Sequence, residues 1–409
     1  METTPPLLYS APWVLPIVKP AIQDGAIAVK AGRIEAVGTV AEIRAGFSDR
    51  EEIRCRGVLM PGLVNAHIHL ELSHLTAVQR PAAGRKMCDW IEDLLRSRGE
   101  SGLTVSEREL YRQQALHNQH RSGVVLLADI GNEPQPPQHG LPVVFLFREF
   151  LAPTGQATAA AKALLSKLPD SVAATAHAPY STSPELLRVL KKRTTRLGQV
   201  FSLHVAESPE EIEFLRSATG SFRDFLERRG AWDETFSDNG DDLEGTVMYL
   251  RRLGLLDSRT LCVHCVHITE NEIRLLANSG AHICLCPGSN RFLRVGKAPV
   301  QHMLRHGLLP ALGTDSIASN ETLDLWREMG ILRADHPGID PGKILEMATL
   351  GGAVALQCAD DFGSLSPGRK AVLLEVHPQR LGRVVSESEL VDILTLNGRP
   401  QMVSWIGCG

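Results

Sequence analysis

The strongest constraint on the fold of this chain is a regular alternation between about residues 60 and 350. Short apolar runs typical of strands are separated there by stretches with the periodicity of helices. Strands that alternate with helices form parallel sheets, and eight of them can close into a barrel. We therefore predict an α/β fold, a (β/α)8 TIM barrel, with strands at 58–67, 124–130, 142–149, 172–177, 200–205, 260–265, 282–286 and 309–314.

The connections between these strands are expected to be mainly helical. Thr269, with Glu272 three residues on, fits a helix N-cap. The connection 208–258 is long, and long insertions often shape a substrate pocket. Helices are predicted at 185–196, 208–217, 245–253, 269–279 and 321–332, and a surface loop at 134–140.

The two ends of the chain carry β signals instead. Residues 8–59 show strand alternation around a turn at 31–32, and strand-like runs return at 368–376, 390–396 and 402–406. We interpret them as one small β-sandwich built from both chain ends. The predicted domains are residues 1–59 (sandwich, first part), 60–360 (barrel) and 361–409 (sandwich, second part).

A pair of histidines follows the first barrel strand. His67 and His69 are two residues apart, so in an extended strand their imidazoles point to the same side. Such a pair can serve as two ligands of one metal ion, because imidazole is the commonest metal ligand. Alone, a pair at a strand end is more often structural.

Three later strand ends carry groups of the same kind. His204 is followed by Glu207, His264 by His267, and the last strand by Asp315. The carboxyl ends of all barrel strands meet at one face, where catalytic residues come from several strands. Buried ionisable groups are costly unless they are paired or bind a metal. These strand ends therefore predict a metal site.

Bulk composition excludes some function classes. The 409 residues have a formal net charge of −4, which gives no reason to expect nucleic acid or an anionic membrane as partner. The sequence has no apolar run long enough for a bilayer and no signal-peptide pattern, so a cytoplasmic protein is expected. The sequence leaves the oligomeric state open, a homo-oligomer included.

Four of the eight cysteines need a separate interpretation. Cys262, Cys265, Cys284 and Cys286 suggest a zinc site, but the last two are separated by one residue, where structural sites usually have two to four. All four lie in apolar runs, where free cysteine behaves as a small hydrophobe. We reject a four-cysteine site.

Together, His67–His69, His204–Glu207, His264 and Gly313–Asp315 resemble the amidohydrolase superfamily, in its branch of nucleobase and nucleoside deaminases and chlorohydrolases. The resemblance covers nearly the whole chain and implies a barrel plus sandwich with a divalent metal at the barrel mouth. It implies His67, His69, His204 and Asp315 as ligands, Glu207 as proton shuttle and His264 as the contact of the metal-bound water. His267 competes for the last role, but His264 directly ends its strand.

The resemblance also bears on the number and kind of metal ions. Binuclear members carry a modified lysine on the fourth strand, and residues 173–178 contain no lysine, which favours one ion per chain. Nitrogen and oxygen ligands suit zinc, our first choice, as well as iron or manganese. His177, on the same strand, resembles a substrate-binding histidine. A core histidine bonded to a carbonyl is an equal alternative.

Motif variants around Glu71, Glu207, 286–290 and 314–320 resemble the aminodeoxyfutalosine deaminases of the futalosine route to menaquinone. The resemblance implies that Glu71, Ser319 and Asn320 contact substrate. Many relatives have arginine where this chain has Gly288. The alternatives are deaminases of S-adenosylhomocysteine, methylthioadenosine or adenosine, or another ring amidohydrolase or chlorohydrolase. A non-catalytic scaffold is disfavoured because every ligand position is occupied.

The sequence signal for a function is less specific at two further positions. Arg148 ends a strand beside Glu149 and is our candidate for a substrate carboxylate, because a guanidinium binds one in bidentate fashion. A rim ion pair between the two is at least as good an interpretation. Trp90 is expected to be helix core.

Overall fold

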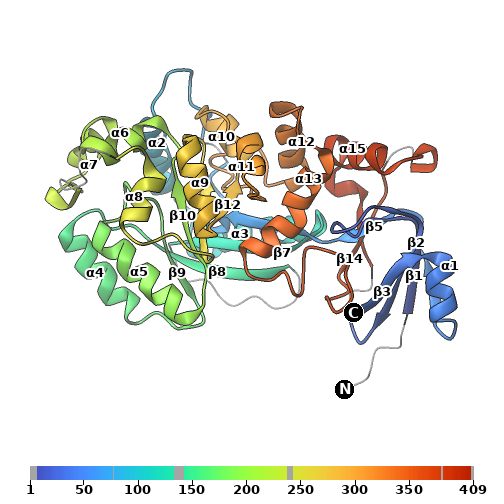
Figure 1. Cartoon of the computed structure of the whole chain (residues 1–409). Helices are drawn as coiled ribbons and strands as arrows, with labels where there is room; N and C mark the ends of the chain where they lie inside the picture. The colour runs from blue at the N-terminus through green and yellow to red at the C-terminus, as the bar shows by residue number, and fades with distance from the viewer. Residues whose placement is uncertain (1–6, 77, 133–141, 237–242, 379–380, 407–409) are drawn as a thin grey trace.

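The computed structural model describes residues 7–76, 78–132, 142–236, 243–378 and 381–406; the predicted loop 134–140 lies outside them. Its centre is made of parallel strands in two four-stranded sheets (Figure 1). One sheet holds β6 (Leu63–Ile68), β7 (Val124–Gly131), β8 (Val143–Phe150) and β9 (Ala173–Ala176). The other holds β10 (Phe201–Val205), β11 (Thr260–His264), β12 (His282–Leu285) and β13 (Ala311–Leu312).

Backbone contacts join the two sheets along both seams. Between β9 and β10, the amide of His204 donates to the carbonyl of His177 at 2.9 Å. Between β13 and β6, Ile68 forms a parallel bridge with Asp315, and the amide of Thr314 donates to the carbonyl of His67 at 3.0 Å. These contacts are those that the predicted barrel requires, and they bring the carboxyl ends of β6, β10 and β13 together.

Helices cover the outside of these strands (Figure 1). The predicted N-cap is confirmed, since the Thr269 side chain accepts from the Glu272 amide at the start of α9 (Glu270–Ser279). Helix α12 (Leu325–Asp335) begins four residues later than predicted, because the Asp324 side chain caps it by accepting from Trp326. The other helices are α1 (Val40–Gly46), α2 (Met87–Glu100), α3 (Val105–Arg121), α4 (Gly155–Leu165), α5 (Pro184–Leu197), α6 (Pro209–Ser217), α7 (Ser221–Arg228), α8 (Thr246–Arg252), α10 (Pro287–Leu293), α11 (Val300–Arg305), α13 (Pro341–Glu346), α14 (Gly352–Ala355) and α15 (Glu387–Asn397).

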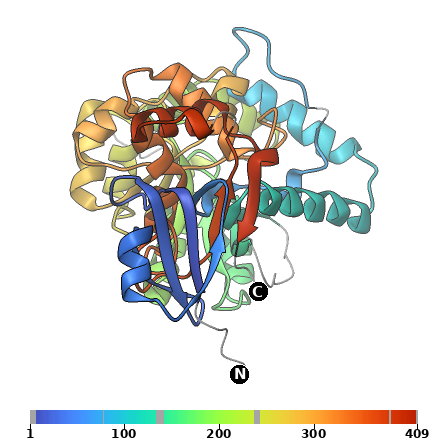
Figure 2. The same ribbon diagram turned by 90° about the vertical axis from the view of Figure 1, so that its right-hand side faces the viewer.

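Both chain ends build a separate seven-stranded sheet, as predicted from their β signals (Figure 2). All seven strands lie in one sheet, and the two-layer sandwich stays a prediction. The three domain boundaries also stay predictions. The sheet has the order β15–β14–β5–β1–β2–β3, with β4 beside β1. Its strands are β1 (Leu7–Val14), β2 (Ile22–Lys30), β3 (Arg33–Thr39), β4 (Glu51–Arg54), β5 (Val58–Pro61), β14 (Leu373–Val376) and β15 (Val403–Ile406).

The predicted strand 58–67 is wrong as a single element. Its first part is β5 of the chain-end sheet, and its second part is β6 of the central strands. The division falls at Gly62, where an added Cβ would lie 2.5 Å from Cβ of Val125. A side chain at this crossing would therefore collide with β7.

The predicted strand 390–396 is also wrong, because these residues belong to α15. Ser386 caps the helix by accepting from the amide of Glu389. Leu390 and Leu394, four residues apart, are fully buried. The β-branched residues of this segment are typical of a strand. The spacing of four residues between the two buried leucines is instead that of a helix, which packs against α12 and α13.

The long connection 208–258 contains α6 and α8 as predicted, and α7, which the sequence analysis missed. Helix α7 is short and largely polar, but it buries Phe222, Phe225 and Leu226. Its polar side chains obscured the apolar face in the sequence.

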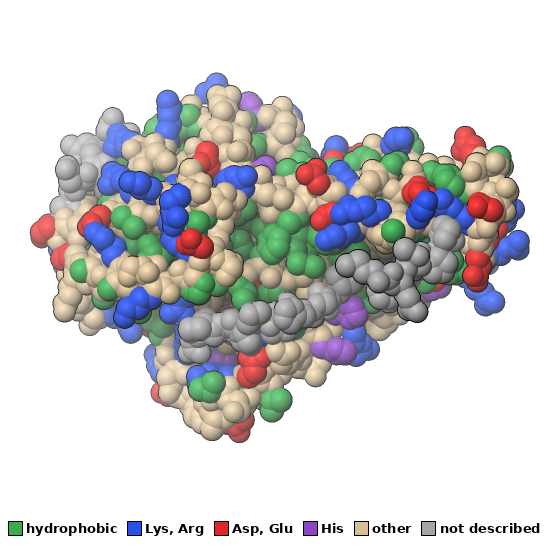
Figure 3. Space-filling model, turned by 90° about the horizontal axis from the view of Figure 1, so that it is seen from below, with side chains coloured by type: hydrophobic (Ala, Val, Ile, Leu, Met, Phe, Trp, Pro, Cys, Tyr) green, Lys and Arg blue, Asp and Glu red, His purple; other side chains and the backbone are tan. Residues whose placement is uncertain are grey.

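Charged side chains of both signs are interspersed over the face seen in Figure 3, and hydrophobic side chains gather near its centre. Among the helices of the described residues, none combines the length and the apolar character that a membrane crossing needs.

Candidate active site

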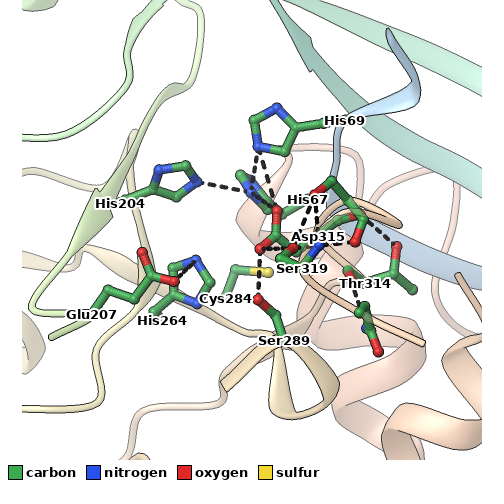
Figure 4. Close-up of polar contacts among 12 residues, drawn as sticks. His67, His69, His204, Glu207, His264, Cys284, Ser289, Thr314, Asp315 and Ser319 are labelled. Atoms are coloured by element: carbon green, nitrogen blue, oxygen red, sulfur yellow. Dashed lines mark hydrogen bonds and ion pairs between the residues drawn. The ribbon is translucent and has the colours of Figure 1, made fainter. Parts of the chain in front are cut away.

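Four predicted ligands meet at the carboxyl ends of β6, β10 and β13 (Figure 4). The Nε2 atom of His67 lies 3.1 Å from Nε2 of His69 and 3.1 Å from Nε2 of His204. The Oδ1 atom of Asp315 lies 3.7 Å from Nε2 of His67 and 3.6 Å from Nε2 of His69. All four side chains are buried, and their ligand atoms lie within 4.8 Å of one another.

The chemistry of this cluster fits a divalent cation. Three imidazole nitrogens that face one another cannot all be satisfied by hydrogen bonds among themselves. Burial lowers the pKa of His67 to about 4 and that of His204 well below its ordinary value, which favours the neutral form that binds metals. Three neutral imidazoles and one carboxylate are a common ligand set for zinc and similar ions.

Asp315 is held by two serines. The hydroxyls of Ser289 and Ser319 donate to its Oδ2 at 2.7 and 2.8 Å, which leaves Oδ1 facing the imidazoles. Asp315 has φ 58°, a left-handed conformation that is rare for a non-glycine residue and typical of functional sites. Burial raises the pKa of this carboxyl, but His67 and His69 outweigh it and lower the pKa well below its ordinary value.

Glu207 and His264 form a second pair beside the cluster. Oε1 of Glu207 lies 3.5 Å from Nε2 of His264, and Nδ1 of His264 lies 2.9 Å from Oδ1 of Asn290. His264 is fully buried with φ 73°, so it too adopts a left-handed conformation. Burial, reinforced by the charge of Asp315, raises the pKa of Glu207 well above its ordinary value.

Glu211, which the sequence analysis did not assign, fixes the backbone of Glu207. Its carboxylate accepts from the amides of Ala206 at 2.8 Å and Glu207 at 3.0 Å, and from the hydroxyl of Thr246 at 3.0 Å. Ala206 has φ 50°, so these bonds hold a left-handed turn directly before Glu207. The signal was present in the run Glu210–Glu211, which reads as an ordinary acidic first turn of a helix.

A cavity of about 320 Å³ opens beside these groups. His69, His204, Glu207, His264 and Asp315 line it, and so do the predicted substrate residues His177, Glu71 and Ser319. His177 bonds through Nδ1 to the hydroxyl of Ser181 at 2.8 Å rather than to a carbonyl. Trp90, expected as helix core, is buried but also faces this cavity.

Two predicted substrate residues are not among those that line the cavity. Arg148 is absent from its wall, whereas the next residue, Glu149, is part of it, because successive side chains of β8 point to opposite faces. Asn320 instead donates to the carbonyl of Thr314 at 2.9 Å and to Glu328 at 2.8 Å. It therefore supports the segment that carries Asp315.

Gly288 lies outside this wall as well. Its amide donates to Oε2 of Glu328 at 2.6 Å, and an added Cβ would lie 2.3 Å from Oε1 of the same carboxylate. Glu328 thus links α12 to the start of α10, which carries Ser289 and Asn290. The motif 286–290 contains both residues, but its pattern alone assigns neither of them a role.

The structure also bears on three remaining questions from the sequence: His267 against His264, the four-cysteine site, and a lysine on the fourth strand. His267 bonds through Nε2 to the carbonyl of Val295 and is not among the cavity-lining residues, whereas His264 is. Cys262 and Cys265 pack in one apolar cluster, and Cys284 and Cys286 in another. The described strand β9 contains no lysine.

Parallel strands whose carboxyl ends gather three imidazoles and a carboxylate are the arrangement of a metal-dependent hydrolase. Comparison with known proteins agrees. A model of the Amidohydrolase family matches residues 58–399, and the chain belongs to this metal-dependent family.

Two curated relatives are similar over most of their length. The 5-methylthioadenosine/S-adenosylhomocysteine deaminase of Teredinibacter turnerae is 28% identical over 413 residues, covering 92% of this chain and 85% of that protein. The aminodeoxyfutalosine deaminase of Deinococcus radiodurans is 29% identical over 357 residues, covering 81% of each chain.

Two solved structures share the fold. An adenosine deaminase from Xanthomonas campestris with bound zinc superposes with a TM-score of 0.73 at 25% identity, covering 97% of this chain and 90% of that one. The aminofutalosine deaminase of Helicobacter pylori in complex with methylthio-coformycin superposes with a TM-score of 0.80 over 96% of both chains. Its 22% identity makes it evidence for the fold alone.

Proposed function

We propose that this chain is a metal-dependent hydrolytic deaminase that converts the adenine amino group of a nucleoside to a carbonyl and releases ammonia. The observation that carries this proposal is one cavity lined by Glu207, His264 and His177 together with His69, His204 and Asp315 of the cluster. Ring deamination needs an activated water and a donor for a ring nitrogen side by side. The deaminase names of both curated relatives support the same reaction.

We propose one divalent cation per chain, held by His67, His69, His204 and Asp315, and zinc as its identity. When bound, such an ion lowers the pKa of a water molecule enough to supply hydroxide near neutral pH. The zinc-bound adenosine deaminase of similar fold supports this choice of metal.

The chain's own groups would then move the protons. Asp315, held through Oδ2 by Ser289 and Ser319, faces the imidazoles with Oδ1 and would take a proton from the attacking water while it binds the cation. Glu207 would protonate the ring nitrogen beside the amino-bearing carbon. His264 would orient the water by accepting a hydrogen bond from it at Nε2. The amino group leaves as ammonia after it receives a proton relayed through the same carboxylates, so the ring gains one oxygen and loses one nitrogen.

We propose aminodeoxyfutalosine, of the menaquinone route, as the preferred substrate, with Glu71, His177 and Ser319 as contacts because they line the cavity. The motif variants around Glu71, Glu207 and Asn320 and the Deinococcus relative support this choice. Methylthioadenosine and S-adenosylhomocysteine remain the competing substrates, because the name of the Teredinibacter relative contains both.

For the fold around this site, we propose a closed barrel formed by residues 60–360 and a β-sandwich formed by residues 1–59 and 361–409.

Ammonia release from a panel of nucleosides tests the proposal. The panel contains aminodeoxyfutalosine, methylthioadenosine, S-adenosylhomocysteine and adenosine, with a chlorinated triazine as the outgroup. We expect ammonia from the adenine nucleosides and the highest kcat/KM for aminodeoxyfutalosine. A higher value for another nucleoside would overturn the substrate, and release of chloride without ammonia would overturn the deaminase.

A further inference from the structure

The cavity has two kinds of wall. Its polar wall comes from the strand ends described above. Much of its apolar wall comes from two helices: α2 contributes Met87, Trp90, Ile91 and Leu94, and α7 contributes Phe225 and Leu226. An ion pair between Arg228 and Glu92, at 2.6 Å, ties the two helices together. Because the reacting ring must lie at the polar wall, the ribose and its 5′ substituent extend toward α2 and α7.

Two arginines line this cavity, and they differ in their partners. Arg98 already lies 3.4 Å from the carboxylate of Glu71 and 3.3 Å from Asn132. Arg229, directly after α7, forms no ion pair with a carboxylate of the described residues, although its guanidinium lies 5.8 Å from the ring centre of Phe225. The two arginines within α7, Arg223 and Arg228, are paired with Glu227 and Glu92.

Resting on the proposed function, we propose that α2 and α7 bind the 5′ substituent of the nucleoside and that Arg229 selects substituents ending in a carboxylate. The apolar side chains cover the aromatic or aliphatic part of the substituent. The guanidinium then meets its anionic end with paired hydrogen bonds. Arg229, and not Arg148, is the specificity-determining cation of this site.

The test compares Arg229→Met with Arg216→Met, a control that removes an exposed arginine of α6 in the same connection. For the metal-loaded enzymes, kcat/KM is measured with aminodeoxyfutalosine, which ends in an aromatic carboxylate, and with methylthioadenosine, which has no charge there. We expect Arg229→Met to lower the ratio of the two values about tenfold or more, through KM. Arg216→Met should keep the ratio within about twofold of the wild type.

Direct binding separates this proposal from the reaction. Calorimetric titration of both nucleosides into Glu207→Gln protein, with and without Arg229→Met, should show weaker binding of the carboxylated nucleoside only. Added salt should weaken that binding in the parent and have less effect after Arg229→Met. Equal losses for both nucleosides, or no loss, would overturn the role of Arg229 even if ammonia is released. Selective loss of binding without ammonia release in wild-type protein would overturn the deaminase but keep Arg229.

Discussion

Oδ1 of Asn290 lies 2.9 Å from Nδ1 of His264, while Nε2 of the same imidazole faces Glu207 at 3.5 Å. An amide oxygen only accepts hydrogen bonds, so Nδ1 carries the proton and Nε2 is free to accept. Asn290 thereby sets the tautomer that His264 presents to the cavity.

Asn290→Ala should remove the hydrogen bond that fixes this tautomer of His264. We expect kcat to fall about fivefold, the equivalent of roughly 1 kcal/mol for one neutral hydrogen bond. Steady-state ammonia release measures the effect. The control is Asn271→Ala, which changes a half-buried residue of α9 whose side-chain amide donates to Glu244. An unchanged kcat in Asn290→Ala would show that His264 does not depend on this bond.

Pure protein should contain close to one divalent ion per chain. His67→Ala should lower this content, because the imidazoles of His69 and His204 both converge on His67 Nε2. His267→Ala is the matched control, since that histidine bonds to the carbonyl of Val295 instead. Elemental analysis provides the measurement, and two ions per chain bridged by a modified lysine would contradict the single site.

Glu207→Gln should keep the metal and lower kcat by at least ~10², the usual size of a general acid–base contribution. The amide keeps the shape of the side chain but cannot shuttle a proton. Glu213→Gln, on the exposed side of α6, should leave kcat near the wild-type value. Near-normal turnover in Glu207→Gln, measured with metal content verified, would rule out the shuttle.

Gly288→Ala should destabilise the protein by about 1–3 kcal/mol, the usual cost of forcing a methyl group into packed space. The new Cβ would lie 2.3 Å from Glu328 and 2.6 Å from Asn320. Gly46→Ala, where an added Cβ meets nothing within 4 Å, serves as the control. Thermal unfolding monitors both variants, and equal midpoints would show that α10 shifts without cost.

Glu328 should give the stability of the protein a pH dependence near neutrality. Burial raises the pKa of its carboxyl to about 7 from an ordinary value of 4.5. The folded protein therefore keeps this proton where the unfolded chain has lost it. Its contribution to stability is complete below about pH 4.5 and is lost as the pH rises through about 7, with a total on the order of 3 kcal/mol.

Glu328→Gln removes this titration, at the cost of one hydrogen bond to Gly288 or Asn320. The unfolding midpoint, followed from pH 5 to pH 8, should fall less steeply in Glu328→Gln than in the wild type. The exposed Glu100→Gln, at the end of α2, should keep the wild-type slope. Parallel pH profiles for Glu328→Gln and the wild type would contradict a protonated Glu328.

The sequence located the candidate ligands because their position depends on local features. His67, His204 and Asp315 each follow an apolar run, and the period of a strand places His69 on the same side as His67. The α/β alternation then implied that these strand ends meet. The order of the strands and the spacing of two residues thus place these four side chains at one face of the fold.

Only the tertiary structure decided which neighbours complete the site. The strand-end position of Arg148 suggests a substrate contact, but the pairing of β8 with β7 and β9 turns Glu149 to the cavity instead. Leu390–Thr395 became helical because α12 and α13 offer a surface that fits helical spacing. Arg229 reaches the cavity because the apolar face of α7 packs against the rest of the fold. The sequence determines which groups are available at each strand end, whereas the side to which a residue points and the partner it meets depend on contacts between segments far apart in the chain.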